Sequence, residues 1–177
     1  NVVRENPRRL IFSGGEDERV LRTVQALLQE NALPPLVVGR RGVVEQNIRQ
    51  LGLRIRPDSD FQLLDPVHFE RYGDLADEYY DLMGRRGVLP ADAEGILRTN
   101  STALAALLLR RGEADAMIAG PSGGFHEHYR HIVDIIGLRE GVRVPAAMQL
   151  LILDKGTYFI TDAYINYKPS VDELVEI

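Results

Sequence analysis

A glycine-rich turn followed by histidines and an arginine is the part of the sequence best suited to chemistry. Residues 112–136 read GEADAMIAGPSGGFHEHYRHIVDII. The apolar start predicts a buried strand, the glycines predict a turn, and the end predicts a helix. Three kinds of site fit these residue types: a nucleophilic serine, a metal held by histidines, and a cradle for a phosphorylated ligand.

The nucleophile interpretation rests on the pattern Gly-x-Ser-x-Gly, which runs from Gly120 to Gly124 with Ser122 at its centre. A nucleophile elbow needs this pattern between a strand and a helix, which is the context predicted here. The triad of such enzymes runs Ser, Asp, His along the chain, and no histidine follows His131. A glycine turn with positive φ accounts for the same residues without catalysis.

The metal interpretation rests on the three histidines that follow the turn. His126 and His131 are five residues apart, so on a helix they point roughly 140° apart. The zinc motif HExxH needs a spacing of four, which this pair does not have. His128 shares a face with His131, but two ligands do not make a site. Solvated or capping histidines therefore explain these residues better.

The phosphate interpretation fits best. A glycine turn exposes backbone N–H groups at the N-terminus of a helix, where the helix dipole favours an anion. Gly123 and Gly124 supply such groups, and Ser122 adds a hydroxyl. Arg130 follows on the second turn of the helix, and Arg86 lies in a separate glycine-flanked loop. The planar guanidinium of arginine suits a phosphate, although the sequence has neither a Walker lysine nor a GxGxxG motif.

Two other segments place polar residues after predicted strands. SGGEDE, residues 13–18, looks like a phosphate loop, but its acidic residues would repel an anion. They would instead stabilise the start of a helix by a few tenths of a kcal/mol each, so we expect capping there. FITDAYIN places Asp162 and Asn166 at the end of a strand. They would hydrogen-bond either a ligand or a neighbouring loop, and the spacing does not decide between the two.

Composition limits the classes of partner. The chain has 177 residues and a net charge of −5. A broad nucleic-acid surface or an anionic membrane patch needs a positive field, so we expect neither partner. The chain has no cysteine, which excludes disulfides and suits a cytoplasmic location. The longest apolar run, Ala103–Leu109, is too short to cross a bilayer.

Hydrophobic periodicity predicts strands that alternate with helices. The strand segments are residues 8–15, 34–39, 60–66 and 114–120, followed by 146–153 and 157–165 with a hairpin turn between them. The helical segments are residues 16–31, 42–52, 67–84, 90–111 and 125–136. This alternation predicts a three-layer α/β/α, Rossmann-like fold with a mainly parallel sheet and an added antiparallel hairpin.

Ligands of such sheets bind beyond the carboxyl ends of the strands. We therefore expect Ser13–Asp17, Gly120–Gly124 and Thr161–Asn166 to point toward one site. Near the end of the sequence, Ser170 and Glu173 form a capping box, so a helix starts there and the sequence stops within about two turns. A helix that short is not stable alone, and the sequence begins without an initiator methionine. We expect a fragment of a longer protein.

Several segments taken together resemble a known family. They are NSTALAALLLRRGEADAMIAG, HIVDIIGLREGV and LILDKGTYFITDAYINYKPSVDELVEI. These segments are similar to the phosphate acetyltransferase-like domain, in particular the version fused behind the catalytic part of bacterial NADP-dependent malic enzymes. IFSGGEDERVLRTVQ and PPLVVGR fit the opening of that domain. The resemblance covers nearly all of residues 6–177.

The resemblance implies that the chain is the first lobe of a two-lobe phosphotransacetylase fold with the ligand cleft between the lobes. Residues 1–7 would be a linker from an upstream catalytic domain, residues 8–169 the N-terminal α/β lobe, and residues 170–177 the start of a helix leading to the second lobe. Active transferases of this family move an acetyl group between phosphate and coenzyme A. Their catalytic Ser-Arg and Asp motif would lie outside this chain, so we do not expect the chain alone to catalyse the reaction.

The family's ligand-binding residues match this chain in part. The transferases hold phosphate-bearing ligands with an arginine after the strand that ends at Gly120, and Arg130 matches it. Their Ser/Thr-rich loop is not present, because this chain reads GGFHE over residues 123–127. A second ligand-binding arginine falls at Met83, with Arg85 and Arg86 nearby.

In the hybrid malic enzymes, the resemblance implies a regulatory domain that binds acetyl-CoA as an effector and helps to assemble a homo-oligomer. NADP and a divalent metal would belong to the catalytic domain, and we expect no cofactor in this chain. The expected ligand-binding residues are Ser122, Gly123, Gly124, Arg130, Arg86 and Asn166. Two alternatives remain open: a competent phosphate acetyltransferase, and an assembly module that binds no ligand.

Overall fold

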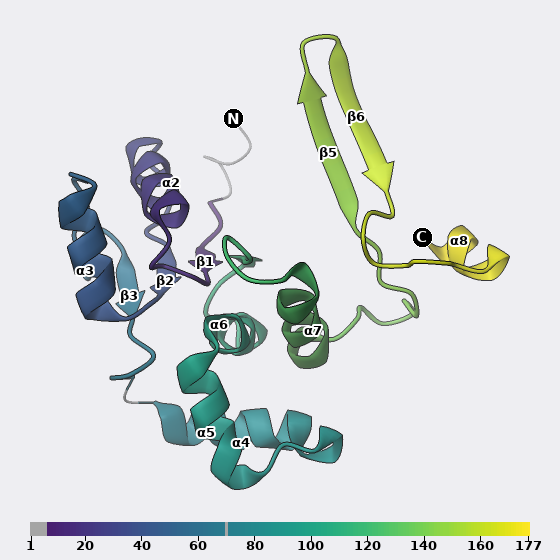
Figure 1. Ribbon diagram of the computed structural model, residues 1–177, viewed down its shortest axis with the longest axis horizontal. Coiled ribbons are helices and arrows are strands. Elements are labelled where there is room, and N and C mark those ends of the chain that lie inside the picture. Colours follow the sequence, from purple (N-terminus) through teal and green to yellow (C-terminus); the bar gives the residue numbers. More distant parts are fainter. Residues whose placement is uncertain (1–6, 70) are drawn as a thin grey trace. The chain divides into compact units, whose positions relative to one another are not determined.

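The computed structural model describes residues 7–69 and 71–177 (Figure 1). The chain forms two compact units, one ending at Ile136 and the other running from Gly137 to Ile177. This boundary falls inside the range 8–169, which the resemblance groups as one lobe. The predicted linker, residues 1–7, lies outside the described residues apart from Pro7.

The first unit contains a parallel sheet of four short strands in the order β3-β2-β1-β4. The strands are β1 (Leu10–Phe12), β2 (Leu36–Val38), β3 (Gln62–Leu64) and β4 (Ala116–Ile118). Ile11 of β1 pairs with Leu36 on one side and with Met117 on the other. Nearly all strand residues are apolar, as expected where helices cover both faces of a parallel sheet. All four predicted strand segments are confirmed.

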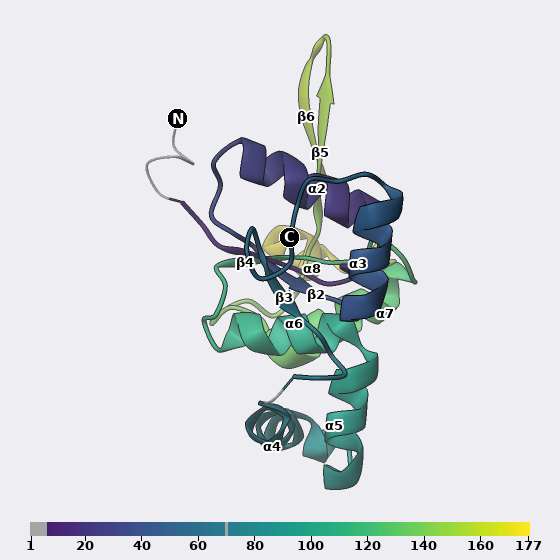
Figure 2. The same ribbon diagram turned by 90° about the vertical axis from the view of Figure 1, so that its left-hand side faces the viewer.

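Helices cover the sheet on both faces. The helices are α2 (Glu18–Gln29), α3 (Arg41–Gln50), α4 (Tyr72–Met83), α5 (Pro90–Thr99), α6 (Ser101–Arg110) and α7 (Phe125–Ile136), with a 3-10 turn, η1 (Gly84–Arg86), after α4. Because side chains alternate along a strand, Phe12 packs with α2 and α3, whereas Ile11 packs with the opposite layer. Figure 2 shows α2 and α3 on one side of the sheet and α4 to α6 on the other. The predicted α/β/α arrangement is confirmed.

Helix α6 runs through the core, and every residue from Thr102 to Leu108 is buried. The prediction of one helix over residues 90–111 is wrong, because the chain leaves the helical conformation at Asn100, with φ −118° and ψ 97°. The Asn100 side chain caps α6 by accepting a hydrogen bond from the backbone N–H of Ala103 at 2.9 Å. An asparagine side chain that bonds the backbone in this way ends one helix and starts another.

The second unit consists of a hairpin and a short helix. Strands β5 (Met148–Leu153) and β6 (Gly156–Thr161) pair antiparallel and form a sheet of their own. Helix α8 (Val171–Glu176) starts with the predicted capping box at Ser170. Thr161–Asn166 begins at the last residue of β6, which is not a strand of the parallel sheet, so its approach to the predicted site stays a prediction. A two-residue turn joins only antiparallel neighbours, which keeps β6 beside β5.

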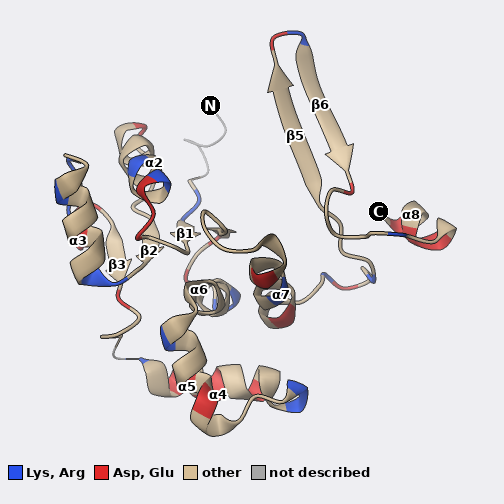
Figure 3. Ribbon diagram, viewed as in Figure 1, with Lys and Arg blue, Asp and Glu red and all other residues tan. Residues whose placement is uncertain are grey.

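The hairpin is apolar on both faces. Neither strand contains a charged residue (Figure 3), and exposed apolar side chains alternate between the faces. Ile152 is 75 % exposed on one face, and Leu153 is 57 % exposed on the other. Within residues 7–69 and 71–177, no helix is both long enough and apolar enough to cross a membrane.

Gly15, in the loop after β1, provides a test of the packing between this loop and β2. A Cβ at Gly15 would overlap the Val37 side chain and would lie 3.0 Å from the Val38 carbonyl oxygen. We expect Gly15→Ala to lower the free energy of unfolding by about 1–3 kcal/mol because the core has no room for the methyl group. Gly95→Ala is the control, since a Cβ at Gly95 on α5 meets nothing within 4 Å, and it should stabilise by about 0.5–1 kcal/mol. Urea unfolding measures the stability of both variants. Equal changes in the free energy of unfolding would contradict the close packing at Gly15.

Candidate functional site

The loops after β1, β2 and β4 meet at the carboxyl edge of the parallel sheet. The backbone N–H of Ser13 donates to the Ile118 carbonyl at 3.0 Å, and the N–H of Gly15 donates to the Val38 carbonyl at 2.8 Å. These bonds continue the strand pairing past the ends of the strands. Of the three predicted segments, Ser13–Asp17 and Gly120–Gly124 are therefore brought to one edge.

The turn Gly120–Gly124 has the predicted backbone. Gly120 and Gly123 have φ values of +84° and +96°, in the region that favours glycine. Ser122, Gly123 and Gly124 are exposed. The Gly124 carbonyl accepts a hydrogen bond from the Glu127 N–H at 3.1 Å as α7 begins. The turn therefore places exposed backbone at a helix N-terminus, where an anion is stabilised.

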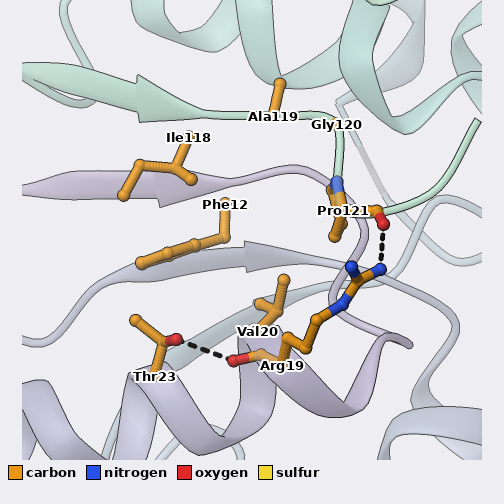
Figure 4. Close-up of a pocket in the computed structure, with 8 residues that line it drawn as sticks. All are labelled: Phe12, Arg19, Val20, Thr23, Ile118, Ala119, Gly120 and Pro121. Atoms are coloured by element: carbon orange, nitrogen blue, oxygen red, sulfur yellow. Dashed lines mark hydrogen bonds between the residues drawn. The ribbon is translucent and has the colours of Figure 1, made fainter. Parts of the chain in front are cut away.

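The turn is attached to the loop after β1. The Pro121 carbonyl accepts a hydrogen bond from the Arg19 guanidinium of α2 (Figure 4). The Pro121 ring packs against Gly14, where a Cβ would lie 2.9 Å from Pro121 Cγ. Beside this contact is a cavity of about 220 Å³, walled by Phe12, Val20 and Ile118 among others.

The two predicted arginines, Arg86 and Arg130, line one cleft of about 640 Å³, which we call the arginine cleft. Both pair with Asp134: Arg86 through Nη1, and Arg130 through Nε at 3.6 Å. The arginine side chains are 53 % and 80 % exposed, whereas that of Asp134 is 16 % exposed. Each guanidinium has five N–H donors, so a carboxylate that holds both arginines leaves donors for a ligand. The remaining lining residues are Tyr79, Met83, Val88, Ile96, Thr99, Asn100, His126, Glu127 and His131.

The role of Asp134 was not predicted from the sequence. Its position four residues after Arg130 is a signal for an ion pair on one helix face. No sequence signal links it to Arg86, which is 48 residues away.

Ser122 lines a different cleft, of about 520 Å³, which we call the loop cleft. Gly14, Glu16, Arg40 and Arg98 also line it, and Thr99 lines both clefts. Glu16 holds the Arg40 guanidinium through two hydrogen bonds of 2.7 Å, and this pairing lowers the pKa of the Glu16 carboxyl. Of the predicted site residues, Ser122 thus lines the loop cleft, whereas Arg86 and Arg130 line the arginine cleft.

The acidic residues after β1 act as the capping prediction requires. The Asp17 carboxylate accepts a hydrogen bond from the Arg19 backbone N–H at 2.8 Å at the start of α2. Its pKa is lowered, chiefly by hydrogen bonds from the Arg19 side chain. Capping at this helix is confirmed.

Asn166 lies in the second unit, where it bonds its own neighbourhood. Its Nδ2 donates to the Pro145 carbonyl at 2.8 Å and to Asp162 Oδ2 at 2.7 Å. Asp162 Oδ1 accepts a hydrogen bond from the Ala147 N–H at 2.9 Å. Of the two interpretations, the bond to a neighbouring loop is therefore seen, and ligand contact by Asn166 stays a prediction.

Two of the histidines of α7, His128 and His131, contact polar groups within the protein. His128 Nε2 lies 2.7 Å from the Ser122 carbonyl oxygen, so this histidine bonds the backbone of Ser122. Across residues 7–69 and 71–177, no three His, Asp or Glu side chains are grouped to hold a metal ion.

His131 contacts the cap of α6. His131 Nε2 lies 2.9 Å from Asn100 Nδ2. The amide orientation of Asn100 is fixed because its oxygen accepts from Ala103, so its NH₂ donates to an unprotonated Nε2. Burial lowers the pKa of His131; nearby Arg130 and His128 lower it further, and Glu127 acts in the opposite direction.

Comparison with known proteins identifies the class. The whole chain, residues 1–177, matches the family described as phosphate acetyl/butaryl transferase. The chain belongs to this family, as the resemblance predicts.

Its relatives include malic enzymes as well as transferases. The chain is 46 % identical over 168 residues to an NAD-dependent malic enzyme of Rhizobium meliloti, with 95 % of the chain and 22 % of that protein covered. It is 38 % identical over 175 residues to an NADP-dependent malic enzyme of Escherichia coli, covering 99 % of the chain and 23 % of that protein. It is 24 % identical over 169 residues to a phosphate acetyltransferase of Bacillus subtilis, covering 96 % of the chain and 51 % of that protein. The chain thus spans under a quarter of the malic enzymes and about half of the transferase.

Solved structures share the fold. The EutD phosphotransacetylase from Staphylococcus aureus superposes with a TM-score of 0.83 at 23 % identity, over 96 % of this chain and 50 % of that one. A phosphotransacetylase from Streptococcus pyogenes superposes with a TM-score of 0.84 at 24 % identity, over 96 % of this chain and 51 % of that one. The predicted fold class is confirmed.

The contact between His131 and Asn100 predicts a pH dependence of stability. Because the folded state lowers the pKa of His131, the unfolded chain binds this proton more readily as pH falls through about 6.5. The free energy of unfolding should therefore decrease on acidification below about pH 6.5. His131→Gln should reduce this decrease, whereas His126→Gln, at an exposed position, should not. Urea unfolding of the three proteins at about pH 8 and about pH 5.5 measures the effect, and parallel losses in all three would exclude His131 as its source.

Proposed function

We propose that the chain is a regulatory domain that binds acetyl-CoA and belongs to a malic enzyme. A catalytic portion outside this chain would carry out the oxidative decarboxylation of malate, with its NADP and divalent metal. The similarity to malic enzymes over nearly the whole chain supports this assignment. The observation that carries the proposal is that Arg86 and Arg130 meet at Asp134 in one cleft.

The arginine cleft has the chemistry that a coenzyme A thioester requires. Two exposed guanidinium groups at one end suit phosphates, which they bind with paired hydrogen bonds. Met83, Val88 and Ile96 supply an apolar wall for the uncharged part of the ligand. Asp134 and Glu127 would repel an anion, so bound phosphate would share the arginines with Asp134.

Regulation would require two quaternary states with different affinities for the effector. A coupling free energy of about 1–3 kcal/mol is typical of such systems. A homo-oligomer provides the two states in this proposal, and the acetyl-CoA bound here would favour the less active one.

Arg130 tests the proposed site in the full-length protein. Acetyl-CoA should lower malate decarboxylation, and Arg130→Ala should raise the half-inhibitory concentration about tenfold or more, because a hydrogen-bonded charge pair is worth about 1.5–3 kcal/mol. Arg22→Ala is the matched control, since Arg22 lies on α2 and pairs with Glu18, four residues before it. Inhibition of the Arg130→Ala protein at the wild-type concentration would contradict the assignment of the site.

The second candidate function is phosphate acetyl transfer, which the family match and the Bacillus subtilis relative favour. Because the Ser/Thr-rich loop is replaced by Gly123–Glu127, we expect the full-length protein to form no acetyl phosphate from acetyl-CoA and phosphate. A coupled assay of coenzyme A release measures this, with a known phosphate acetyltransferase as the positive control. Formation of acetyl phosphate above background would establish the transferase function instead.

A further inference from the structure

We infer that His128 is a positioning residue that holds the turn Gly120–Gly124 in the conformation that presents its amides to an anionic ligand. The inference rests on the proposed function only for the identity of the ligand. The geometry of the turn carries the rest.

His128 joins the turn to the core through both ring nitrogens. Nε2 lies 2.7 Å from the Ser122 carbonyl oxygen, and Nδ1 lies 2.8 Å from Thr102 Oγ1. Thr102 Oγ1 in turn lies 3.4 Å from Ser13 Oγ, and both residues are at most 2 % exposed. A chain of polar groups therefore connects the end of β1, the first turn of α6 and the glycine turn.

The Ser122 carbonyl determines the role of one ring nitrogen. A carbonyl oxygen only accepts, so Nε2 carries a proton and donates it to Ser122. At Nδ1 the partner is the Thr102 hydroxyl, which can donate or accept. Contacts at both nitrogens therefore fix the orientation of the ring.

The glycines fit closely around the ring. A Cβ at Gly123 would lie 2.9 Å from His128 Nε2, and one at Gly120 would lie 3.5 Å from Cδ2. Both φ values are positive and so favour glycine, and at Gly123 the imidazole also leaves no room for a Cβ. The ring therefore fills the inner side of the turn.

The bond to Ser122 decides where the next amide points. The peptide between Ser122 and Gly123 is trans, so its C=O and N–H point in opposite directions. Because the carbonyl points to His128, the Gly123 N–H is directed away from the ring, on the side where Ser122 to Gly124 are exposed. The preceding carbonyl, of Pro121, is held by Arg19. Donors from two helices thus fix two successive peptides, which reduces the ordering that a phosphate would otherwise have to impose.

Two substitutions separate positioning from simple packing. Glutamine places its amide NH₂ where histidine has Nε2, so His128→Gln keeps the donor to Ser122. Asparagine reaches only as far as Nδ1, so His128→Asn loses that donor. Hydrogen exchange of the turn peptides, read by mass spectrometry on the ligand-free full-length protein, should be about tenfold faster in His128→Asn and near wild type in His128→Gln. The half-inhibitory acetyl-CoA concentration should follow the same order.

The exchange measurement decides the inference, and the inhibition measurement decides the proposed function. Wild-type exchange of the turn in His128→Asn would overturn the positioning role, whatever acetyl-CoA does. If the wild-type protein is not inhibited by acetyl-CoA, the proposed function fails, and faster exchange in His128→Asn alone still supports the role of His128. Should His128→Asn not fold, His128→Leu removes the donor to Ser122 while leaving a side chain in its place, and it should speed exchange of the same peptides. Unchanged exchange in that variant would overturn the inference.

Discussion

The hydrogen bonds of the Asn100 side chain are the interaction on which the first unit depends most. The oxygen caps α6 through the Ala103 N–H, and the nitrogen contacts His131 on α7. The cap lies where α5 ends and α6 begins, and α6 is buried from Thr102 to Leu108. It also places Thr102 in the first turn of α6, beneath the glycine turn. One amide therefore links the core, the arginine cleft and the support of the turn.

Charge in the arginine cleft is arranged by one carboxylate. Like charges repel, so Arg86 and Arg130 would not stay close together without a counter-charge. Asp134 supplies it from a largely buried position, while both guanidiniums remain exposed. In the proposed site, this pairing would hold both guanidiniums in place before an anion binds. In the loop after β1, by contrast, each carboxylate pairs with one arginine. Glu16 pairs with Arg40, and Asp17 pairs with Arg19.

Local sequence patterns predict most of the fold because the relevant forces act over a few residues. Apolar runs mark the four parallel strands, and a capping box marks the start of α8. The break at Asn100 was missed because helix-forming residues lie on both sides of it, although the polar run RTNST, residues 98–102, includes residue types that cap helices. The pairing of Asp134 with Arg86 was missed because it joins residues far apart in sequence. The glycine turn was predicted correctly as a left-handed turn, but its support by His128 depends on the position of α6, which no local pattern encodes. Ser122 and Arg130 are close in sequence but line different clefts, which no local pattern predicts either.

The hairpin of β5 and β6 has a consequence for the chemistry of the chain in water. Two strands on their own bury little surface and are marginal in stability, and here both faces of the ribbon are apolar, as the exposure of Ile152 on one face and Leu153 on the other illustrates. An uncovered ribbon of this kind has strand edges that can pair with further strands and apolar faces that can adhere to other apolar surfaces. Covering these faces would therefore favour solubility, and leaving them bare would favour aggregation.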